Sequence, residues 1–231
     1  MSHPVDGRRE AAPRLLAISD GRSSGDPGER RWSDLLGRLE AIGAALQLRE
    51  KHLDDRRLTE LATWIRRRFS GPLILNGRPD LAVAVGADGV HLPADGAPTR
   101  TVREMLARHG GACLLGRSCH VENEVAAAAA EGADYVVFGP VFATRSKSGS
   151  ATGGVDALRR AARHRVPVLA LGGISSSNGA SALAAGAHGL AAITAFATDS
   201  EAHALARLVD HSAVVEPTAA ELAPGTDQVG R

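Results

Sequence analysis

Short apolar runs alternate along the chain with longer amphipathic stretches. Eight runs have the length of β-strands, at residues 15–19, 45–49, 72–76, 89–92, 113–118, 135–139, 166–171 and 189–193. Eight stretches with apolar residues at helical spacing follow them, at residues 32–41, 57–69, 81–85, 103–109, 121–130, 155–164, 180–185 and 202–209. Several strands are apolar throughout, which is typical of a parallel sheet with both faces covered. The pattern predicts one helix after every strand.

A short repeat supports a regular architecture. Gly-Ala-Asp at 86–88 and 132–134, and Gly-Ala-His at 186–188, precede the fourth, sixth and eighth predicted strands. Each glycine is expected to end a helix in a left-handed conformation. Recurrence at every second unit favours a closed (β/α)8 TIM barrel over the alternative, an open doubly wound sheet.

The barrel is expected to span residues 13–212. The composition beyond it turns to Pro, Thr, Glu, Gly and Asp, so residues 1–12 and 213–231 are predicted to be disordered tails. Residues 22–31, rich in Gly, Ser and charge, are predicted to form a mobile loop after the first strand.

Composition narrows the function classes. A net charge of +1 and 3% aromatic residues argue against a nucleic-acid surface, and 44% hydrophobic residues suit a globular protein with a sizeable core. No apolar stretch has the length of a signal peptide or membrane span, which predicts a cytoplasmic protein without a membrane partner. Cys113 and Cys119 have a spacing that suits neither a disulfide framework nor a zinc site. Only two of the 27 basic residues are lysines, Lys51 and Lys147.

Active sites of such barrels lie at the carboxyl ends of the strands, so polar residues that follow the apolar runs are the candidates. They are Gln47, Arg49, Lys51, Asn76, His91, Ser118, His120, Thr144, Lys147, Gly172, Gly173, Thr194 and Ala195. His91, Ser118 and Thr144 rank second among them.

Two features indicate a phosphorylated ligand. Gly172 and Gly173 leave backbone N–H groups accessible to an anion, at the position where barrels commonly bind phosphate together with the loop at 194–195. The alternative is a tight turn at a helix entry. Arg49 and Lys51 supply charge for a second anionic group, the alternative being solvated surface charge.

Two of the nine histidines are candidates for proton transfer. His91 and His120 follow predicted strands, and imidazole titrates near neutral pH. A packing or helix-entry role is the alternative for His120, and a hydrogen bond to a loop is the alternative for His91. Cys119 should point away from His120, because adjacent strand residues face opposite sides, so covalent catalysis by such a pair is not expected.

Four motifs in order resemble the thiamine phosphate synthase/TenI family. They are Gln-Leu-Arg-Glu-Lys at 47–51, Gly-Ala-Asp-Gly-Val-His-Leu at 86–92, Gly-Ala-Asp-Tyr-Val-Val-Phe-Gly-Pro-Val-Phe at 132–142 and Gly-Gly-Ile at 172–174. The resemblance implies a TIM barrel with one of two activities. The synthase joins a pyrimidine diphosphate to a thiazole phosphate with Mg²⁺, whereas the TenI branch is a metal-free tautomerase that aromatises a thiazole carboxylate phosphate.

Two positions distinguish the branches. The resemblance implies aspartates as metal ligands in the synthase where this chain has Gly77 and Gly96. Mg²⁺ usually takes one or two protein carboxylates, so these glycines favour the tautomerase, with no metal or other cofactor. Asp80 and Asp95 could compensate only if a loop were reshaped.

In the tautomerase interpretation His120 transfers a proton as base and then as acid. The substrate phosphate binds Gly172, Gly173 and the 194–195 backbone, and Lys147 adds a cation. Two alternatives stay open. One is a thiamine phosphate synthase using Mg²⁺, and the other is a non-catalytic binder of a phosphorylated ligand. The expected partner is a small phosphorylated thiazole, and a homo-oligomer is left open.

Overall fold

Eight parallel strands close into one barrel in the computed structural model, which describes residues 12–108, 113–144 and 153–213. The strands pair in chain order, and β8 pairs with β1. They are β1 Leu15–Ile18, β2 Ala45–Leu48, β3 Leu73–Asn76, β4 Gly89–Leu92, β5 Leu114–Cys119, β6 Tyr135–Phe138, β7 Val168–Leu171 and β8 Gly189–Ala192. The predicted (β/α)8 barrel is confirmed, and the open sheet is excluded.

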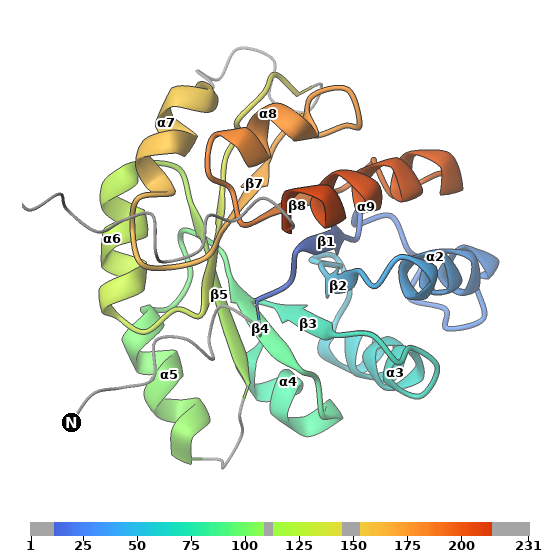
Figure 1. Cartoon of the computed structure of the whole chain (residues 1–231). Coiled ribbons are helices and arrows are strands. Elements are labelled where there is room, and N and C mark those ends of the chain that lie inside the picture. The colour runs from blue at the N-terminus through green and yellow to red at the C-terminus, as the bar shows by residue number, and fades with distance from the viewer. Residues whose placement is uncertain (1–11, 109–112, 145–152, 214–231) are drawn as a thin grey trace, which may run out of the picture.

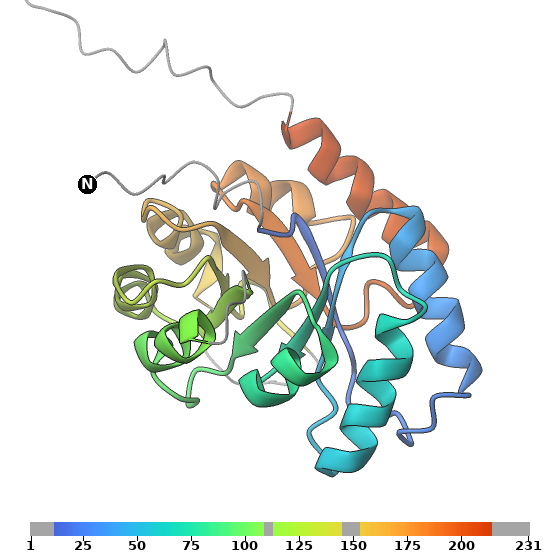
Figure 2. The same cartoon turned by 90° about the horizontal axis from the view of Figure 1, so that it is seen from below.

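A helix follows each strand on the outside of the barrel (Figure 1 and Figure 2). The helices are α2 Arg30–Ala41, α3 Asp55–Arg66, α4 Pro79–Val85, α5 Thr99–Arg108, α6 Glu122–Ala130, α7 Gly154–Ala161, α8 Gly179–Ala184 and α9 Asp199–Ala213. The last helix lies beside the first, where Arg38 Nε donates to Asp199 Oδ1 at 2.5 Å. In the described ranges no helix is both long and apolar enough to cross a bilayer.

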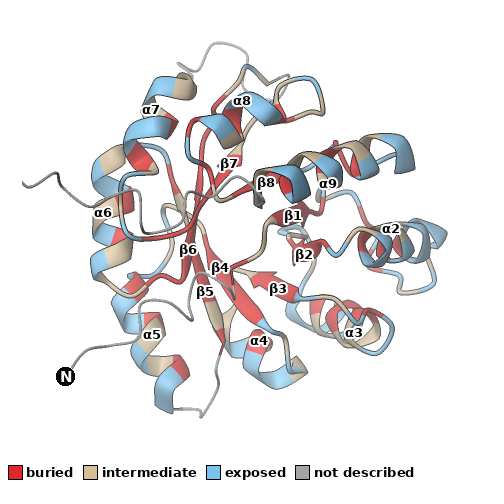
Figure 3. Ribbon diagram, in the orientation of Figure 1, coloured by how far each residue is buried: buried red, intermediate tan, exposed pale blue. Residues whose placement is uncertain are grey.

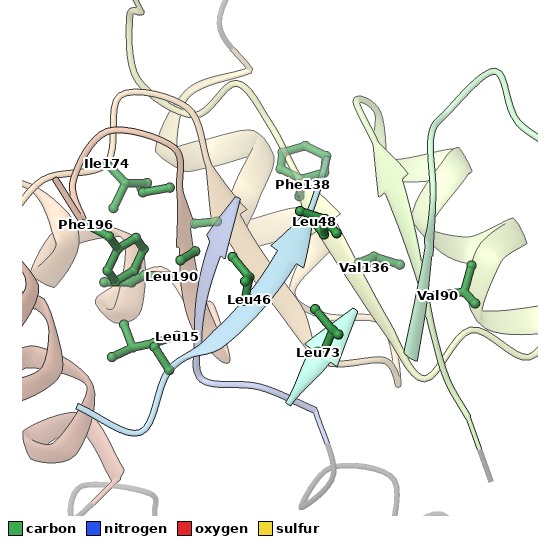
Figure 4. Close-up of a cluster of buried hydrophobic side chains, with 14 of the residues drawn as sticks. Leu15, Leu46, Leu48, Leu73, Val90, Val136, Phe138, Ile174, Leu190 and Phe196 are labelled. Atoms are coloured by element: carbon green, nitrogen blue, oxygen red, sulfur yellow. The ribbon is translucent and has the colours of Figure 1, made fainter. Parts of the chain in front are cut away.

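The strands are apolar on both faces because the barrel has two cores. Leu16, Ile74 and Leu169 belong to a cluster of strand residues inside the barrel. Leu46 and Val136 face outward and pack against the helices (Figure 4). In Figure 3 the strands are mostly red, which marks buried residues, and the helices carry pale blue, exposed residues on their outer sides. Burial on both faces explains why the strands lack the alternating polar residues of a half-exposed sheet.

The repeated glycines end helices as predicted. Gly86 caps α4 with a φ of 66°, and Gly132 and Gly186, which follow α6 and α8, have φ angles of 92° and 96°. This left-handed backbone is strained for a residue with a Cβ atom. The chain can therefore turn directly from each helix into the next strand.

The two repeated aspartates have a further role that the pattern did not predict. Asp88 and Asp134 each accept a backbone N–H at 2.8 Å, from Leu73 and Leu115 respectively, through their Oδ2 atoms. An arginine from a neighbouring helix pairs with each carboxylate, Arg66 with Asp88 and Arg103 with Asp134. These contacts join adjacent strands at the amino-terminal end of the barrel.

Predicted and observed borders agree to within two residues for strands and four for helices. Most helices begin earlier than their apolar periodicity, and α3 shows a cause. Asp54 precedes α3 and accepts the N–H of Arg57 at 2.8 Å, so that helix starts two residues before the predicted border. The tails predicted to be disordered fall almost entirely outside the described residues and stay predictions.

Candidate functional site

Four polar side chains lie on interior-facing positions near the carboxyl ends of adjacent strands. Gln47, Asn76, His91 and Ser118 belong to β2, β3, β4 and β5, and Asn76 is in register with His91. Gln47 and His91 are each only 2% exposed. Above the apolar interior layer, the barrel thus carries a layer of hydrogen-bonding groups, which we call the polar ring. The structure brings together these four of the predicted site residues.

One half of the polar ring holds an unsatisfied acceptor. Gln47 Nε2 donates to Asn76 Oδ1 at 3.0 Å, which orients both amides. Gln47 Oε1 is buried and has no hydrogen-bond partner among the described residues. A buried polar atom without a partner destabilises a fold by about 1–3 kcal/mol, so such atoms often bind a ligand or an ordered water.

The other half is centred on His91. Its Nε2 lies 2.9 Å from Ser118 Oγ, and its Nδ1 lies 3.3 Å from the hydroxyl of Tyr135. Burial, together with a smaller effect of the Arg117 charge, lowers the pKa of His91 to about 3. The imidazole is therefore neutral near physiological pH. His91 is held in this structure by two hydrogen-bonding contacts, and the proton transfer that its strand-end position suggested stays a prediction.

Gly116 and Tyr135 were missed by the sequence analysis. A Cβ atom on Gly116 would lie 2.2 Å from Tyr135 Cζ and 2.6 Å from His91 Nδ1, so only glycine leaves room for the pair. Tyr135 is fully buried, and burial raises the pKa of its hydroxyl. A signal was present, because Tyr135 is the only tyrosine and begins an otherwise aliphatic strand.

The Gly172–Gly173 turn follows β7 with positive φ angles of 102° and 62°. A Cβ atom at Gly172 would lie 2.6 Å from Pro140 Cα, and one at Gly173 would lie 2.5 Å from the carbonyl oxygen of Ala143. Close packing against the segment after β6 is thus one reason for both glycines. No hydrogen bond among the described residues uses either glycine N–H as donor. These N–H groups can bind an anion, so the tight turn and the phosphate interpretation are compatible.

Two basic residues follow β2, the strand that carries Gln47 of the polar ring. Arg49 is half-buried after β2, and its backbone N–H donates to Ser19 Oγ at 2.7 Å. Lys51 is exposed. Within the described ranges neither side chain forms an ion pair with a carboxylate. Their positive charges are available to an anionic ligand.

The remaining predicted residues have different surroundings. Thr194 is exposed and Ala195 is buried after β8, while Thr144 is half-buried after β6. Lys147 lies outside the described residues. The predicted grouping of the 194–195 backbone and Lys147 around one phosphate stays a prediction.

His120 lies on the surface after β5. Its Nδ1 contacts the carbonyl oxygen of Gly139, and its backbone N–H donates to Glu124 Oε2 at 2.6 Å. Cys119 points the other way into the helix-packed core, and burial raises its thiol pKa to about 12. The expectation that the two do not form a catalytic pair is consistent with this geometry.

A buried carboxylate anchors the loop after β1. The Glu50 side chain is 0% exposed, and its Oε2 accepts the N–H of Ser23 at 3.2 Å. Ser23 Oγ in turn accepts the Trp32 indole N–H at 3.0 Å. The loop predicted to be mobile is thus tied to the segment that carries Arg49 and Lys51. Sequence analysis treated Glu50 only as part of a motif, because nothing local indicates that a charged residue will be buried.

Metal ligation has weak support in this site. No group of three or more His, Cys, Asp or Glu side chains in the described part of the chain is placed to hold a metal ion. Gly77 and Gly96 lie after β3 and β4, at the two positions where the family resemblance implies carboxylates.

Comparisons with known proteins identify the family. The family described as thiamine monophosphate synthase matches residues 15–196. A protein of Geobacter sulfurreducens named putative thiamine-phosphate synthase is 45% identical over 198 residues, covering 84% of this chain and 91% of its own. A thiamine-phosphate synthase of Chloroflexus aurantiacus is 41% identical, covering 72% and 78% respectively. The solved thiamine phosphate pyrophosphorylase of Pyrococcus furiosus superposes with a TM-score of 0.74 at 26% identity, covering 90% and 99%.

These comparisons overturn one prediction. The expectation that a thiazole tautomerase is more probable than the transferase is wrong, because the similar proteins are named as the synthase. Assignment to the isomerase branch rested on Gly77, Gly96 and the position of His120. Missing carboxylates show which ligands a site lacks, but they do not determine which reaction the remaining residues perform.

The fold and the family agree over nearly the whole described barrel. The match at 15–196 begins at β1 and ends four residues after β8, so it includes every strand and the whole polar ring. The chain belongs to the thiamine monophosphate synthase family.

Proposed function

We propose that this chain is a thiamine-phosphate synthase, a transferase that joins a pyrimidine diphosphate to a thiazole phosphate and releases diphosphate. The observation that carries the proposal is the similarity to proteins of that name at 41–45% identity over most of both chains. The site adds a physical argument. Polar groups that can orient a heterocycle, two cations without a carboxylate partner in the described ranges, and a glycine turn that can bind phosphate groups all follow or end strands at the same end of the barrel.

Each part of the site has a task in this proposal. Gly172 and Gly173 offer backbone donors to one phosphate, because no Cβ atom obstructs the approach. Arg49 and Lys51 face the more highly charged diphosphate, where positive charge stabilises the leaving group as the bond to carbon breaks. Gln47 and Asn76 orient a ring substituent through the unsatisfied Gln47 Oε1.

The His91 group serves as a neutral support for the same pocket. Burial keeps the His91 imidazole uncharged, so it does not contribute positive charge for binding the phosphate groups. The Ser118 hydroxyl is therefore held by a neutral ring nitrogen and keeps a hydrogen-bonding position for substrate. No proton transfer by His91 is required for diphosphate to leave.

Ligand binding without turnover is a second candidate function. The glycines at positions 77 and 96 favour it, since they remove the two carboxylates that the family resemblance implies for catalysis with Mg²⁺. Both functions predict binding of phosphorylated ligands, but only the synthase predicts a new covalent product.

A coupling assay separates the two candidates. Purified full chain is incubated with hydroxymethylpyrimidine diphosphate and thiazole phosphate, with and without Mg²⁺, and thiamine phosphate and released diphosphate are quantified together. The synthase proposal expects equal amounts of both products. Arg49→Gln should reduce the rate at least about tenfold, as expected for loss of a charged contact.

A matched control is available on the outer helices. Arg56 is exposed on α3 and pairs with Glu60 at 3.0 Å, so Arg56→Gln should leave the rate unchanged. If calorimetry shows that both substrates bind but no thiamine phosphate appears, the synthase proposal is contradicted and the binding function is favoured.

A further inference from the structure

The two glycine positions lie together at the ends of β3 and β4. A Cβ atom on Gly77 would lie 3.7 Å from Pro93 Cδ, and a Cβ atom on Gly96 would lie 3.0 Å from the same atom. Gly77 has a φ of 69° and its N–H donates to the His91 carbonyl at 2.8 Å. Gly77 therefore adjoins the polar ring, Gly96 packs against Pro93, and neither position supplies a side chain.

The nearest carboxylates are engaged in other contacts. Arg78 follows Gly77, and its guanidinium binds Asp55 and also Asp80, at 2.7 Å from Asp80 Oδ2. This ion pair holds the pKa of Asp80 below its usual value. Glu50 is buried, and its Oε2 accepts the Ser23 N–H, whereas its Oε1 has no hydrogen-bond partner among the described residues. Asp55, Asp80 and one oxygen of Glu50 are thus tied to structural partners, and a single remaining carboxylate oxygen does not replace two missing ligands.

Asp95 is the remaining acid on the loop after β4, and its segment is fixed. Arg117, on β5, donates to the carbonyl oxygens of Ala94 and Ala97 at 2.9 and 2.5 Å. The Gly96 N–H donates to the Pro93 carbonyl at 2.9 Å. Moving Asp95 to the position of Gly96 would break these bonds, so the reshaped loop considered from the sequence is not favoured.

Positive charge is concentrated on the strands that flank these glycines. Arg49 and Lys51 follow β2, next to β3, and Arg117 lies on β5, next to β4. Arg117 has backbone carbonyls as partners, and no carboxylate in the described residues neutralises any of the three cations. The residues present do not fit a magnesium site, which needs carboxylate oxygens, but they fit a polyanion directly.

We infer that the residues of this chain do not hold a divalent cation for the diphosphate, so the diphosphate that the proposed function assigns to Arg49 and Lys51 binds without a metal held by protein carboxylates. The inference rests on the proposed function for the identity of the substrate that carries the diphosphate. It concerns binding and applies equally to a chain that binds without turnover.

Calorimetry of the full chain with inorganic pyrophosphate tests the inference. Titrations are compared in EDTA and in excess Mg²⁺. A site made of protein cations binds pyrophosphate in EDTA, and Mg²⁺ leaves the affinity unchanged or weakens it, because the metal neutralises part of the ligand charge in solution. Loss of binding in EDTA, or an affinity increase of about tenfold on adding Mg²⁺, would overturn the inference.

Variants assign the effect to particular residues. Arg49→Gln and Lys51→Gln should each weaken pyrophosphate binding in EDTA by about tenfold, whereas Arg56→Gln should change it by less than about twofold. Unchanged binding in both the Arg49 and the Lys51 variant would contradict the assignment. Circular dichroism verifies that each variant is folded.

A second pair of variants tests the effect of a carboxylate at position 77. Gly77 has room for a side chain, and Asn and Asp tolerate its left-handed backbone better than other residues do. Gly77→Asp should weaken binding in EDTA and recover it in Mg²⁺, while the isosteric Gly77→Asn should show no response to metal. Identical behaviour of the two variants would overturn the placement of the anion beside β3.

The two proposals can fail separately. Product formation that requires Mg²⁺, with pyrophosphate binding that also requires it, would overturn this inference and leave the proposed function intact. Binding of pyrophosphate in EDTA without any coupled product would overturn the proposed function and leave this inference intact.

Discussion

The two ends of the barrel treat their charged and polar groups in opposite ways. At the amino-terminal end, Asp88 and Asp134 each bind a backbone N–H and an arginine, so the groups around these two carboxylates are matched within the protein. At the carboxyl end, Gln47 Oε1 is buried without a partner among the described residues, and Arg49 and Lys51 have no carboxylate partner there. The same fold thus has a stabilising end and a binding end.

The difference has a physical cause. A matched hydrogen bond or ion pair lowers the energy of the folded chain but leaves nothing for a ligand. A group that stays unmatched until a ligand arrives contributes its full interaction to binding, at a cost in stability. The comparison therefore predicts that substitutions at the amino-terminal end change stability and leave binding unaffected. Substitutions of the unmatched groups at the carboxyl end should weaken binding and change stability less.

The largest stability effect is expected at the amino-terminal end. Asp134→Ala removes the partner of Arg103 and leaves the Leu115 N–H without its acceptor, which should lower the free energy of unfolding by about 2–4 kcal/mol. Urea denaturation measures the loss. Pyrophosphate affinity of the folded variant should not change, and the exposed Asp156→Ala should affect neither quantity. Weakened binding in Asp134→Ala would mean that the two ends are not independent.

An acid-dependent loss of stability is expected at the carboxyl end. The folded pKa of His91, about 3, lies below its ordinary value of 6.5, so the unfolded chain takes up the proton first as the pH falls. The stability that comes from keeping His91 neutral is complete above about pH 6.5. Between pH 6.5 and 5 the free energy of unfolding should fall by about 2 kcal/mol, at about 1.4 kcal/mol per pH unit. Denaturation at several pH values of wild type and His91→Asn isolates it.

The control for this pH effect is an exposed histidine. His203 lies on α9 and contacts the Asp199 carbonyl at 2.8 Å. His203→Gln should retain the wild-type pH dependence, whereas His91→Asn should lose most of it. Equal pH dependence of the unfolding free energy in wild type and His91→Asn would show that the buried imidazole does not cause the acid-dependent loss of stability.

A smaller stability effect of opposite sign is expected for Gln47→Leu. The substitution removes the buried acceptor that lacks a partner, together with one hydrogen bond to Asn76, and the free energy of unfolding should rise by about 1 kcal/mol. Coupling activity should fall at least about tenfold, because the polar ring loses its free acceptor. The exposed Asn123→Leu on α6 serves as control. A Gln47→Leu variant that is both less stable and fully active would contradict the trade-off.

The smallest effect is expected for Cys119. Its thiol is buried outside the barrel and its pKa is raised to about 12, so the native protein should not react with iodoacetamide at pH 8. Cys119→Ala should leave coupling activity unchanged. Peptide mass spectrometry before and after unfolding measures the labelling. Rapid modification of native Cys119, with loss of activity, would place the thiol at the binding end.

Much of the architecture was predictable because its causes are local. Apolar runs of strand length, amphipathic stretches between them and glycines at helix ends depend on residues close in the chain, and the observed elements follow them. Candidate residues such as Gln47 and Asn76 were identified because strand alternation and the carboxyl-end rule assign them to one surface.

Other features depend on residues that are distant in the chain. The space for His91 and Tyr135 exists because Gly116 lies on the strand between them, and Glu50 is buried because Ser23 returns from the preceding loop. The reaction branch was predicted wrongly because it was inferred from two missing side chains and the position of His120. A side chain that is missing from the sequence does not reveal which groups surround that position in the folded protein.

The sequence by itself determined the (β/α)8 barrel, its repeat and the surface on which polar groups gather, since periodicity and turn chemistry act over a few residues. Only the tertiary structure decided the hydrogen-bonded partners of those groups. It joined Gln47 to Asn76, made His91 neutral by burial and, in the part of the chain that it describes, left Arg49 and Lys51 without carboxylate partners. The reason is that hydrogen bonding, burial and charge balance depend on neighbours in space, which the closure of eight strands brings together.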